Sequence, residues 1–175
     1  MFEGETGNML IRVEKEADQS GVFAVNESAF ESRAEANLVD TLRELAQPVV
    51  SLVAVENGEV VGHIMFSPVV LSEDPDLKLM GLAPMAVVPE FQHHGIGSAL
   101  VREGLEKCRQ LGCAAVVVLG HPDYYPRFGF LPSSRFDIDS EYEVPEEVFM
   151  LIELQPGALS GKNGRVKYHS AFSRA

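Results

Sequence analysis

The feature that most constrains the fold of this chain is a strand, a helix and a second strand in immediate succession. Residues 77–88 are rich in β-forming side chains, and residues 95–111 switch to helical periodicity, with Ile96 and Leu100 on one face. Residues 114–119 are an uninterrupted apolar run, as expected of a strand covered on both faces. Such a unit joins two parallel strands by a right-handed crossover. The chain is therefore predicted to be an α/β protein.

Further strands and helices are predicted around this unit. We expect strands over residues 9–14, 49–56, 59–70, 147–154 and within 165–172, helices over 18–30 and 31–46, and a short helix over 122–128. Asp18 is expected to cap the first helix. Asn57-Gly58 predicts a hairpin turn, because both residues tolerate a positive φ. Pro84 cannot donate to a strand ladder, which predicts a bulge or an unpaired edge at that point.

Length and composition are those of a soluble globular domain. The chain has 175 residues, of which 46% are hydrophobic and 23% charged. We expect one domain over residues 1–175, with residues 1–8 as a mobile tail and 155–175 as a C-terminal extension. The sequence has no stretch of 18 uninterrupted apolar residues, and Glu3 and Glu5 do not suit a secretory signal. A cytoplasmic location is therefore expected.

The net charge of −12 narrows the possible partners. Nucleic acids and anionic membrane surfaces are bound through clustered basic residues, and the sequence has no basic cluster longer than two residues. A cationic substrate such as an amine would instead be attracted. Cys108 and Cys113 lack the neighbours of a zinc site and are expected to be buried free thiols.

The segment from Met85 to Leu100 contains the strongest candidate for a functional site. A strand ends there, a loop with two glycines follows, and a helix starts at once, which is an arrangement suited to binding a pyrophosphate. The dinucleotide fingerprint is excluded because Leu100 stands where its third glycine belongs, and a P-loop is excluded because the loop has no lysine. What remains is Q-x-x-G-x-G, formed by Gln92, Gly95 and Gly97.

This motif resembles the [Q/R]-x-x-G-x-[G/A] hallmark of the GNAT superfamily of N-acetyltransferases. Residues 125–130, Tyr-Pro-Arg-Phe-Gly-Phe, resemble the Y-x-[K/R]-x-G-F string of the same family and follow one strand later, as in the family. The close match covers about residues 79–130, and residues 121–130 also resemble a bacterial subgroup. The resemblance implies the GNAT fold, a mixed twisted sheet flanked by helices with a splay between the fourth and fifth strands.

The resemblance also implies an acetyl-CoA site in that splay. Pantetheine would pair with the exposed strand, the pyrophosphate would lie on the loop amides, and an N–H near Met85 would stabilise the oxyanion. The implied cofactor-binding residues are Met85, Ala86, Val87, Gln92, His93, His94, Gly95, Ile96, Gly97 and Ser98. We interpret the two histidines as solvated or phosphate-facing, and we expect no metal. Arg102 is expected to be a surface charge rather than a contact to the CoA 3′-phosphate.

Tyr125 corresponds to the general acid of the family, which protonates the departing CoA thiolate. The alternative is a buried aromatic residue. Some members carry a glutamate base on the fourth strand, and Gly81 occupies that position here. The general base is therefore not assigned to one group. The candidates are Glu35, His63, His121, Asp123 and a water molecule.

The implied activity is transfer of an acetyl group from acetyl-CoA to a primary amine of a small molecule or peptide, by direct attack within a ternary complex. No covalent intermediate is expected, because neither cysteine lies in a motif with a base. Two alternatives stay open, a non-catalytic acyl-CoA sensor and an enzyme for longer acyl groups. The family resemblance allows a monomer or a homodimer.

Overall fold

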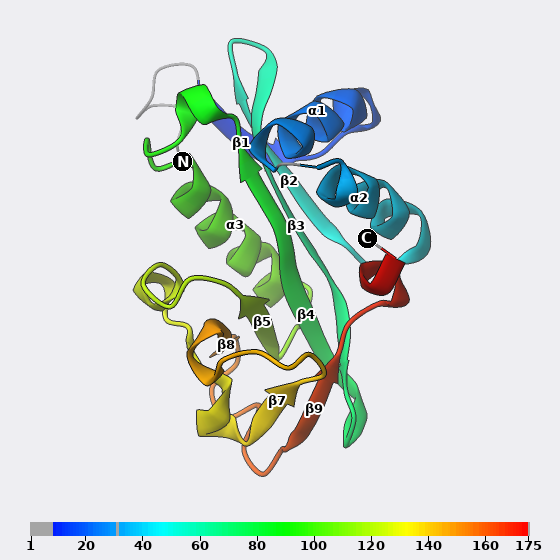
Figure 1. Cartoon of the computed structure of the whole chain (residues 1–175). Helices are drawn as coiled ribbons and strands as arrows, with labels where there is room; N and C mark the ends of the chain where they lie inside the picture. The colour runs from blue at the N-terminus through cyan, green and yellow to red at the C-terminus, as the bar shows by residue number, and fades with distance from the viewer. Residues whose placement is uncertain (1–8, 31, 175) are drawn as a thin grey trace.

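The computed structural model describes residues 9–30 and 32–174 and contains one nine-stranded sheet with helices on both faces (Figure 1). The expected tail at residues 1–8 lies outside the described residues. The strands are β1 (Met9–Val13), β2 (Val50–Glu56), β3 (Glu59–Leu71), β4 (Asp74–Val87), β5 (Ala115–Leu119), β6 (Leu131–Pro132), β7 (Ile138–Ser140), β8 (Phe149–Glu153) and β9 (Gly164–Lys167). The helices are α1 (Gln19–Ala29), α2 (Ala34–Leu45) and α3 (Ile96–Gln110), and two of the short 3-10 turns are η3 (Tyr125–Phe128) and η6 (Ser170–Arg174).

The strand order confirms the predicted crossover. The strands follow one another in the order β1-β2-β3-β4-β5-β8-β6, and β9 pairs with β3 and β7. Along the main path only β4 and β5 are parallel within the described chain, and α3 connects them. All other neighbours on that path are antiparallel. The sheet is therefore mixed, as the family resemblance implied.

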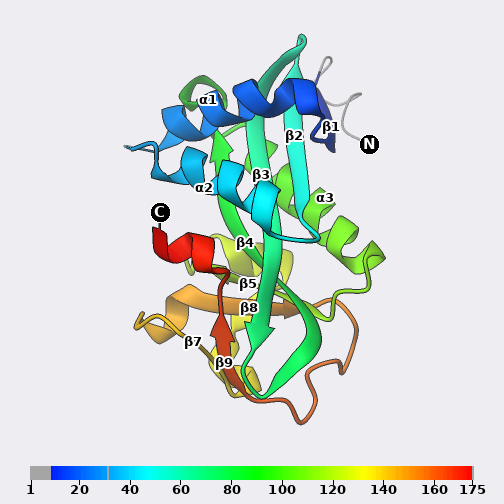
Figure 2. The same ribbon diagram turned by 90° about the vertical axis from the view of Figure 1, so that its right-hand side faces the viewer.

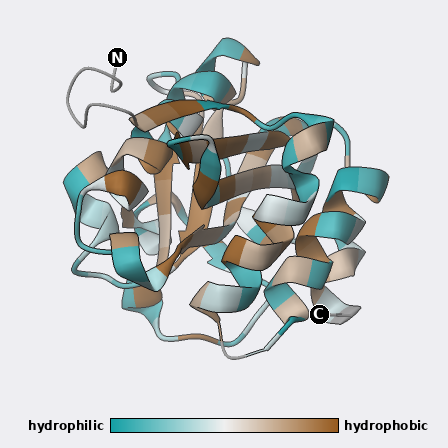
Figure 3. Cartoon of the chain, turned by 90° about the horizontal axis from the view of Figure 1, so that it is seen from above, coloured by the Kyte–Doolittle hydropathy of each residue, from teal (hydrophilic) through white to brown (hydrophobic). Residues whose placement is uncertain are grey.

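The helices cover the sheet on two faces. Figure 2 shows α1 and α2 in front of β2 and β3, with α3 behind the strands. The core between α1, α2 and the sheet contains Val22, Leu42 and Met65, all with no exposed surface, and the core on the α3 side is built around Phe66 and Leu100. Seen from above, the most hydrophobic segments are the strands between these helices (Figure 3).

β4 parts from β5 halfway along its length. Its parallel pairing with β5 covers only Leu79 to Gly81, whereas its antiparallel pairing with β3 continues to Val87. The register against β3 shifts around Pro84, which confirms the predicted bulge. β5 meanwhile continues beside β8 to Leu119. The splay expected between these two strands is therefore present, and the GNAT fold is confirmed.

The turn residues behave as their chemistry predicts. Asn57 and Gly58 have φ angles of 51° and 82°, so the hairpin between β2 and β3 is confirmed. Gly112 follows α3 with a φ of 83°, a conformation that favours glycine after a helix. Cys108 and Cys113 at this end of α3 are both free and buried, as expected.

Some predictions from local sequence were wrong. Asp18 does not cap α1 with its side chain, because its carboxylate accepts hydrogen bonds from the Lys15 N–H at 2.7 Å and from the Arg12 guanidinium at 2.6 Å. The helix expected over 122–128 is only the turn η3, and the strand expected within 165–172 ends at Lys167, before η6. The short strands β6 and β7 were not anticipated. Of the helices that the structure describes, none combines the length and the apolar character needed to cross a bilayer.

Candidate active site

A cavity of about 750 Å³ opens where β4 and β5 diverge. This volume is in the range of small-molecule binding sites. Its wall combines the end of β4, the loop and first turn of α3, the turn η3 and the end of α1. The lining residues are Ala29, Phe30, Met85, Ala86, Val87, Phe91, Gln92, His93, Gly95, Ile96, Gly97, Ser98, His121, Tyr124, Tyr125 and Arg127.

The β4 side of the cavity is an unpaired strand edge. Met85, Ala86 and Val87 pair with β3 on one side, and the partner strand on the other side is lost after Gly81. Backbone N–H and C=O groups along that edge are therefore available to an extended ligand that carries amides.

The α3 side of the cavity is a helix N-terminus. The loop turns sharply into the helix, with φ angles of 66° at His93 and 84° at Gly95. Ala99 N–H makes the first backbone bond of the helix, to the Gly95 carbonyl at 3.0 Å, and no side chain caps this end. The free N–H groups of the first turn therefore lie beside the cavity, at the positive end of the helix dipole. An anion is stabilised at that end. Gln92 secures the loop, because its side-chain amide donates to the Val87 carbonyl at 2.9 Å.

The third side of the cavity is an aromatic cluster on η3. The rings of Tyr124 and Tyr125 meet edge to face with centroids 5.0 Å apart, and Tyr125 also contacts Phe130 at 5.6 Å. The Tyr124 hydroxyl lies 3.2 Å from Ser98 Oγ, which links η3 to the first turn of α3.

Tyr125 is almost fully buried, with 8% of its surface exposed, yet it lines the cavity. Burial, together with the neighbouring Tyr124, raises the pKa of Tyr125 to about 12. The phenol therefore stays protonated well above neutral pH. Gly120 makes room for the ring, since a Cβ there would lie 2.3 Å from Tyr125 Cε2. A larger residue at position 120 would displace the phenol.

The expected site residues are brought together with one exception. His94 is exposed and does not line the cavity, whereas its neighbour His93, which is also exposed, does. Sequence reasoning missed Tyr124 and Arg127 as lining residues, although both lie within or beside the Tyr-Pro-Arg-Phe-Gly-Phe string. It also missed Ala29 and Phe30, which reach the cavity from the far end of α1 and carry no local signal.

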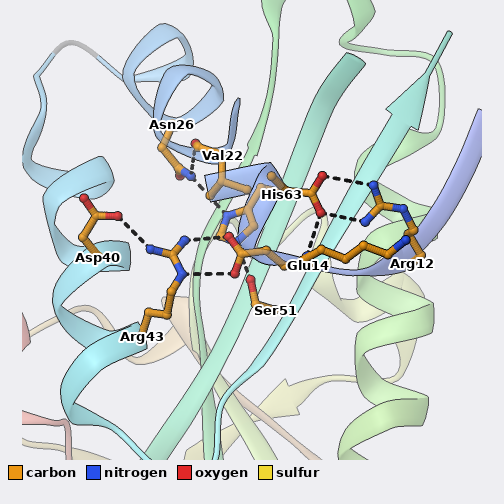
Figure 4. Close-up of polar contacts among 10 residues, drawn as sticks. Arg12, Glu14, Val22, Asn26, Asp40, Arg43, Ser51 and His63 are labelled. Carbon is orange, nitrogen blue, oxygen red and sulfur yellow. Dashed lines mark hydrogen bonds and ion pairs between the residues drawn. The ribbon is translucent and has the colours of Figure 1, made fainter. Parts of the chain in front are cut away.

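The four candidates for the general base lie in different environments. Of these, His121 lines the cavity, whereas Glu35, His63 and Asp123 do not. His63 has no exposed surface, and it lies between α1, α2 and β2 rather than in the cavity (Figure 4).

Both ring nitrogens of His63 are already engaged. Its Nδ1 accepts from the Asn26 side-chain amide at 3.1 Å, and its Nε2–H donates to Ser51 Oγ at 2.9 Å. The Asn26 amide also donates to the Val22 carbonyl at 3.0 Å, which fixes its orientation. Burial, reinforced by the nearby Arg43 charge, lowers the pKa of His63 to about 3. His63 is therefore a neutral side chain that joins α1 to the sheet.

Metal ligands do not gather around the cavity. In the part of the chain that the structure describes, no group of three or more His, Cys, Asp or Glu side chains has a geometry that would hold a metal ion.

The sequence matches a known family and its members. A sequence model described as "Acetyltransferase (GNAT) family" matches residues 13–130. The uncharacterized N-acetyltransferase YhbS of Escherichia coli K12 is 41% identical over 167 residues, which cover 95% of this chain and 99% of YhbS. The uncharacterized N-acetyltransferase YjhQ of the same strain is 40% identical over 83% of this chain and 85% of YjhQ.

Solved structures agree with these matches. The crystal structure of YhbS from E. coli in complex with CoA superimposes with a TM-score of 0.89 and 40% identity, covering 95% of this chain and 93% of that one. A GNAT family acetyltransferase from Brucella melitensis in complex with acetyl-CoA gives a TM-score of 0.78 and 36% identity, over 94% of this chain and 97% of that one. With the splayed sheet, the glycine loop and these full-length relatives in agreement, the chain belongs to the GNAT family of acetyltransferases and is an acyltransferase.

Proposed function

We propose that this enzyme transfers the acetyl group of acetyl-CoA to a primary amine by direct attack within a ternary complex. The observation that carries the proposal is the cavity itself. An unpaired strand edge, a helix N-terminus and a protonated phenol line one space of about 750 Å³. The relatives in complex with CoA and with acetyl-CoA support the same ligand class for this chain.

Acetyl-CoA would lie across the splay. Its pantetheine amides would pair with the free edge of Met85, Ala86 and Val87, as an added strand does. Its pyrophosphate would accept hydrogen bonds from the N–H groups of Ile96, Gly97 and Ser98, where the helix dipole favours negative charge.

The chemistry would then proceed at the thioester. The amine nitrogen attacks the acetyl carbon, and a β4 amide near Met85 stabilises the negative oxygen of the tetrahedral intermediate. The C–S bond breaks as that intermediate collapses, and Tyr125 gives its proton to the departing thiolate. Its high pKa keeps the phenol protonated until that step.

The attacking amine must lose a proton, and the Tyr125 phenolate must regain one from solvent before the next turnover. Among the expected candidates, His121 is favoured as the acceptor of the amine proton because it lines the cavity next to η3, while His63 has both nitrogens engaged elsewhere. The acidic surface of the protein, with a net charge of −12, favours the approach of a cationic amine.

The direct test is release of CoA thiol from acetyl-CoA over a panel of amines, from small polyamines and amino sugars to peptide N-termini and lysine side chains. We expect release that depends on the amine and stops when the enzyme is omitted. If acetyl-CoA binds but no amine class stimulates release, the non-catalytic sensor becomes the better description.

A further inference from the structure

The charge of the cavity differs from that of the molecule as a whole. The chain carries 26 acidic residues and a net charge of −12, but none of the described residues that line the cavity is Asp or Glu. Among those lining residues only Arg127 has a permanent charge, and that charge is positive. The described wall of the cavity therefore offers no carboxylate to a second positive charge on a substrate.

One part of the cavity is left over once acetyl-CoA is placed as proposed. The cofactor would lie along the β4 edge and the first turn of α3, and Ala29 and Phe30, at the end of α1, belong to neither element. The His121 carbonyl accepts a hydrogen bond from the Tyr125 N–H at 3.4 Å, so His121 lies close to the residue where the thioester would react. We call Ala29, Phe30 and His121 the acceptor end of the cavity.

Phe30 gives the acceptor end its apolar character. Its side chain is half-buried and lines the cavity. Within residues 9–30 and 32–174, it belongs to none of the three hydrophobic cores and pairs with no other aromatic ring. Phe23, earlier on α1, lies instead against the Arg33 guanidinium, with Cζ 5.4 Å from the ring centroid. The other described phenylalanines all pack in a core, namely Phe66, Phe91, Phe128, Phe130, Phe136, Phe149 and Phe172.

The Phe30 ring is therefore free to cover an apolar part of a ligand. Binding sites for small molecules are mostly lined by apolar and aromatic side chains, and a few polar groups orient the ligand. Here the polar groups near the ring are the His121 imidazole and the Tyr125 phenol. Both would act on the reacting centre rather than on the remainder of the acceptor.

An apolar acceptor end also suits the chemistry of the attack. Only a neutral amine has the lone pair that attacks the thioester, and removal of water disfavours the ammonium form and lowers its pKa. A second ammonium group on the same substrate would lose its water and find no carboxylate, which is costly. A diamine or polyamine is therefore a poor match for this cavity.

We infer that the acceptor of this enzyme is a primary amine carried on an uncharged apolar group, such as an alkylamine or a phenylalkylamine, and that Phe30 determines this specificity. The inference rests on the proposed function, because the acceptor end is the part of the cavity that acetyl-CoA would leave free.

The test compares hexylamine with hexamethylenediamine as acceptors. The two chains are matched, and their far ends carry a methyl group and a second ammonium group, respectively. Thiol release at saturating acetyl-CoA gives kcat/KM for each amine. We expect the value for hexylamine to be higher by about tenfold or more, because the diamine must bury an unpaired charge. A diamine that is used as well as hexylamine, or better, would overturn the inference.

Variants of Phe30 test its part in this preference. Phe30→Ala should lower kcat/KM for phenethylamine about tenfold, mainly through KM of the amine, and leave KM of acetyl-CoA unchanged. Phe30→Glu should shift the preference toward the diamine, because its carboxylate could pair with the second ammonium. If Phe30→Ala instead raises KM of acetyl-CoA and leaves the amine preference as in the wild type, the ring belongs to the cofactor site and the inference is overturned.

Phe23→Ala is the matched control, because it is the same change on the same helix, at a residue that does not line the cavity. It should leave the ratio between the two amines unchanged. Failure of the proposed function gives a different result, since then no amine stimulates thiol release from bound acetyl-CoA, and the inference fails with it.

Discussion

At the scale of single residues, Tyr125 carries the most specific part of the proposed chemistry. Replacing it with Phe removes the proton donor and keeps the ring that packs against Tyr124 and Phe130. We expect Tyr125→Phe to lower kcat by about 10²-fold with little change in acetyl-CoA affinity, because general acid catalysis typically contributes that much. Steady-state kinetics and calorimetry measure the two effects separately. An undiminished kcat would show that the residue is only part of the aromatic cluster.

The low pKa of the buried His63 predicts how the stability of the protein depends on pH. Its pKa is about 3 in the folded protein and close to 6.5 in an unfolded chain, so the unfolded state binds more protons below pH 6.5. Its contribution to stability is therefore present above pH 6.5 and is lost as the pH falls toward 3. From pH 6.5 to pH 5 this loss amounts to about 2 kcal/mol.

The measurement is the free energy of unfolding by urea at several pH values for the wild-type protein and for His63→Gln. The variant should show a shallower decline between pH 6.5 and 5, whatever its stability at neutral pH. Parallel curves for the two proteins would contradict the low pKa of His63.

Residues could be predicted from sequence where their roles are set by local backbone geometry. The glycine loop and the Tyr-Pro-Arg-Phe-Gly-Phe string are contiguous, so their members appear together in the cavity. The partners of His63 could not be predicted, because Asn26 and Ser51 are 37 and 12 residues away and meet it only in the folded protein. Asp18 was misread for a similar reason, since the Arg12 side chain competes for its carboxylate.

At the scale of secondary-structure elements, the first turn of α3 is expected to hold the pyrophosphate. Gly97→Asp would bring a negative charge to that turn, and its Cβ would lie 3.2 Å from the Tyr124 hydroxyl. We expect acetyl-CoA affinity to fall at least about tenfold, because like charges in contact cost several kcal/mol. Gly97→Ala adds the Cβ without the charge and is the control for calorimetry. If both variants bind like the wild type, the pyrophosphate lies elsewhere.

The close approach of α3 to the sheet depends on Gly104. A Cβ at this position would lie 2.1 Å from Phe66 Cε1, and Phe66 has no exposed surface. Helix propensity alone predicts that Gly104→Ala stabilises the protein by about 1 kcal/mol. We expect destabilisation by about 1–2 kcal/mol instead, because overpacking a core outweighs that gain.

Urea unfolding gives the sign of the Gly104→Ala effect. Combining it with Phe66→Leu should cost less than the two single changes together, since the smaller side chain relieves the contact. Stabilisation by Gly104→Ala alone would mean that α3 and the sheet are further apart than the structure indicates.

Elements with a long, regular pattern were predicted from the sequence, and short ones were not. The period of 3.6 in α3 and the apolar run of β5 extend far enough to identify both. By contrast, β6 has two residues and β7 three, which is too short for any periodicity. The helix expected over 122–128 is too short for its periodicity to fix its bounds, and only Tyr125 to Phe128 form a helical turn.

At the scale of the whole molecule, the splay between β4 and β5 brings the binding features of the site together around one cavity. The loss of β4–β5 pairing after Gly81 creates the cavity, and it also leaves the strand edge that would hold pantetheine. The sequence predicted this splay through the family resemblance and through the bulge at Pro84. The wall formed by the end of α1 depends on how α1 packs across β3, which no local pattern encodes.

The most direct test of this account is calorimetric titration of the purified protein with acetyl-CoA. The account predicts one site with a dissociation constant in the micromolar range, weakened by Gly97→Asp and by added salt. An absence of binding to the folded wild-type protein would contradict the assignment of the cavity to acetyl-CoA, and with it the proposed transfer to an amine.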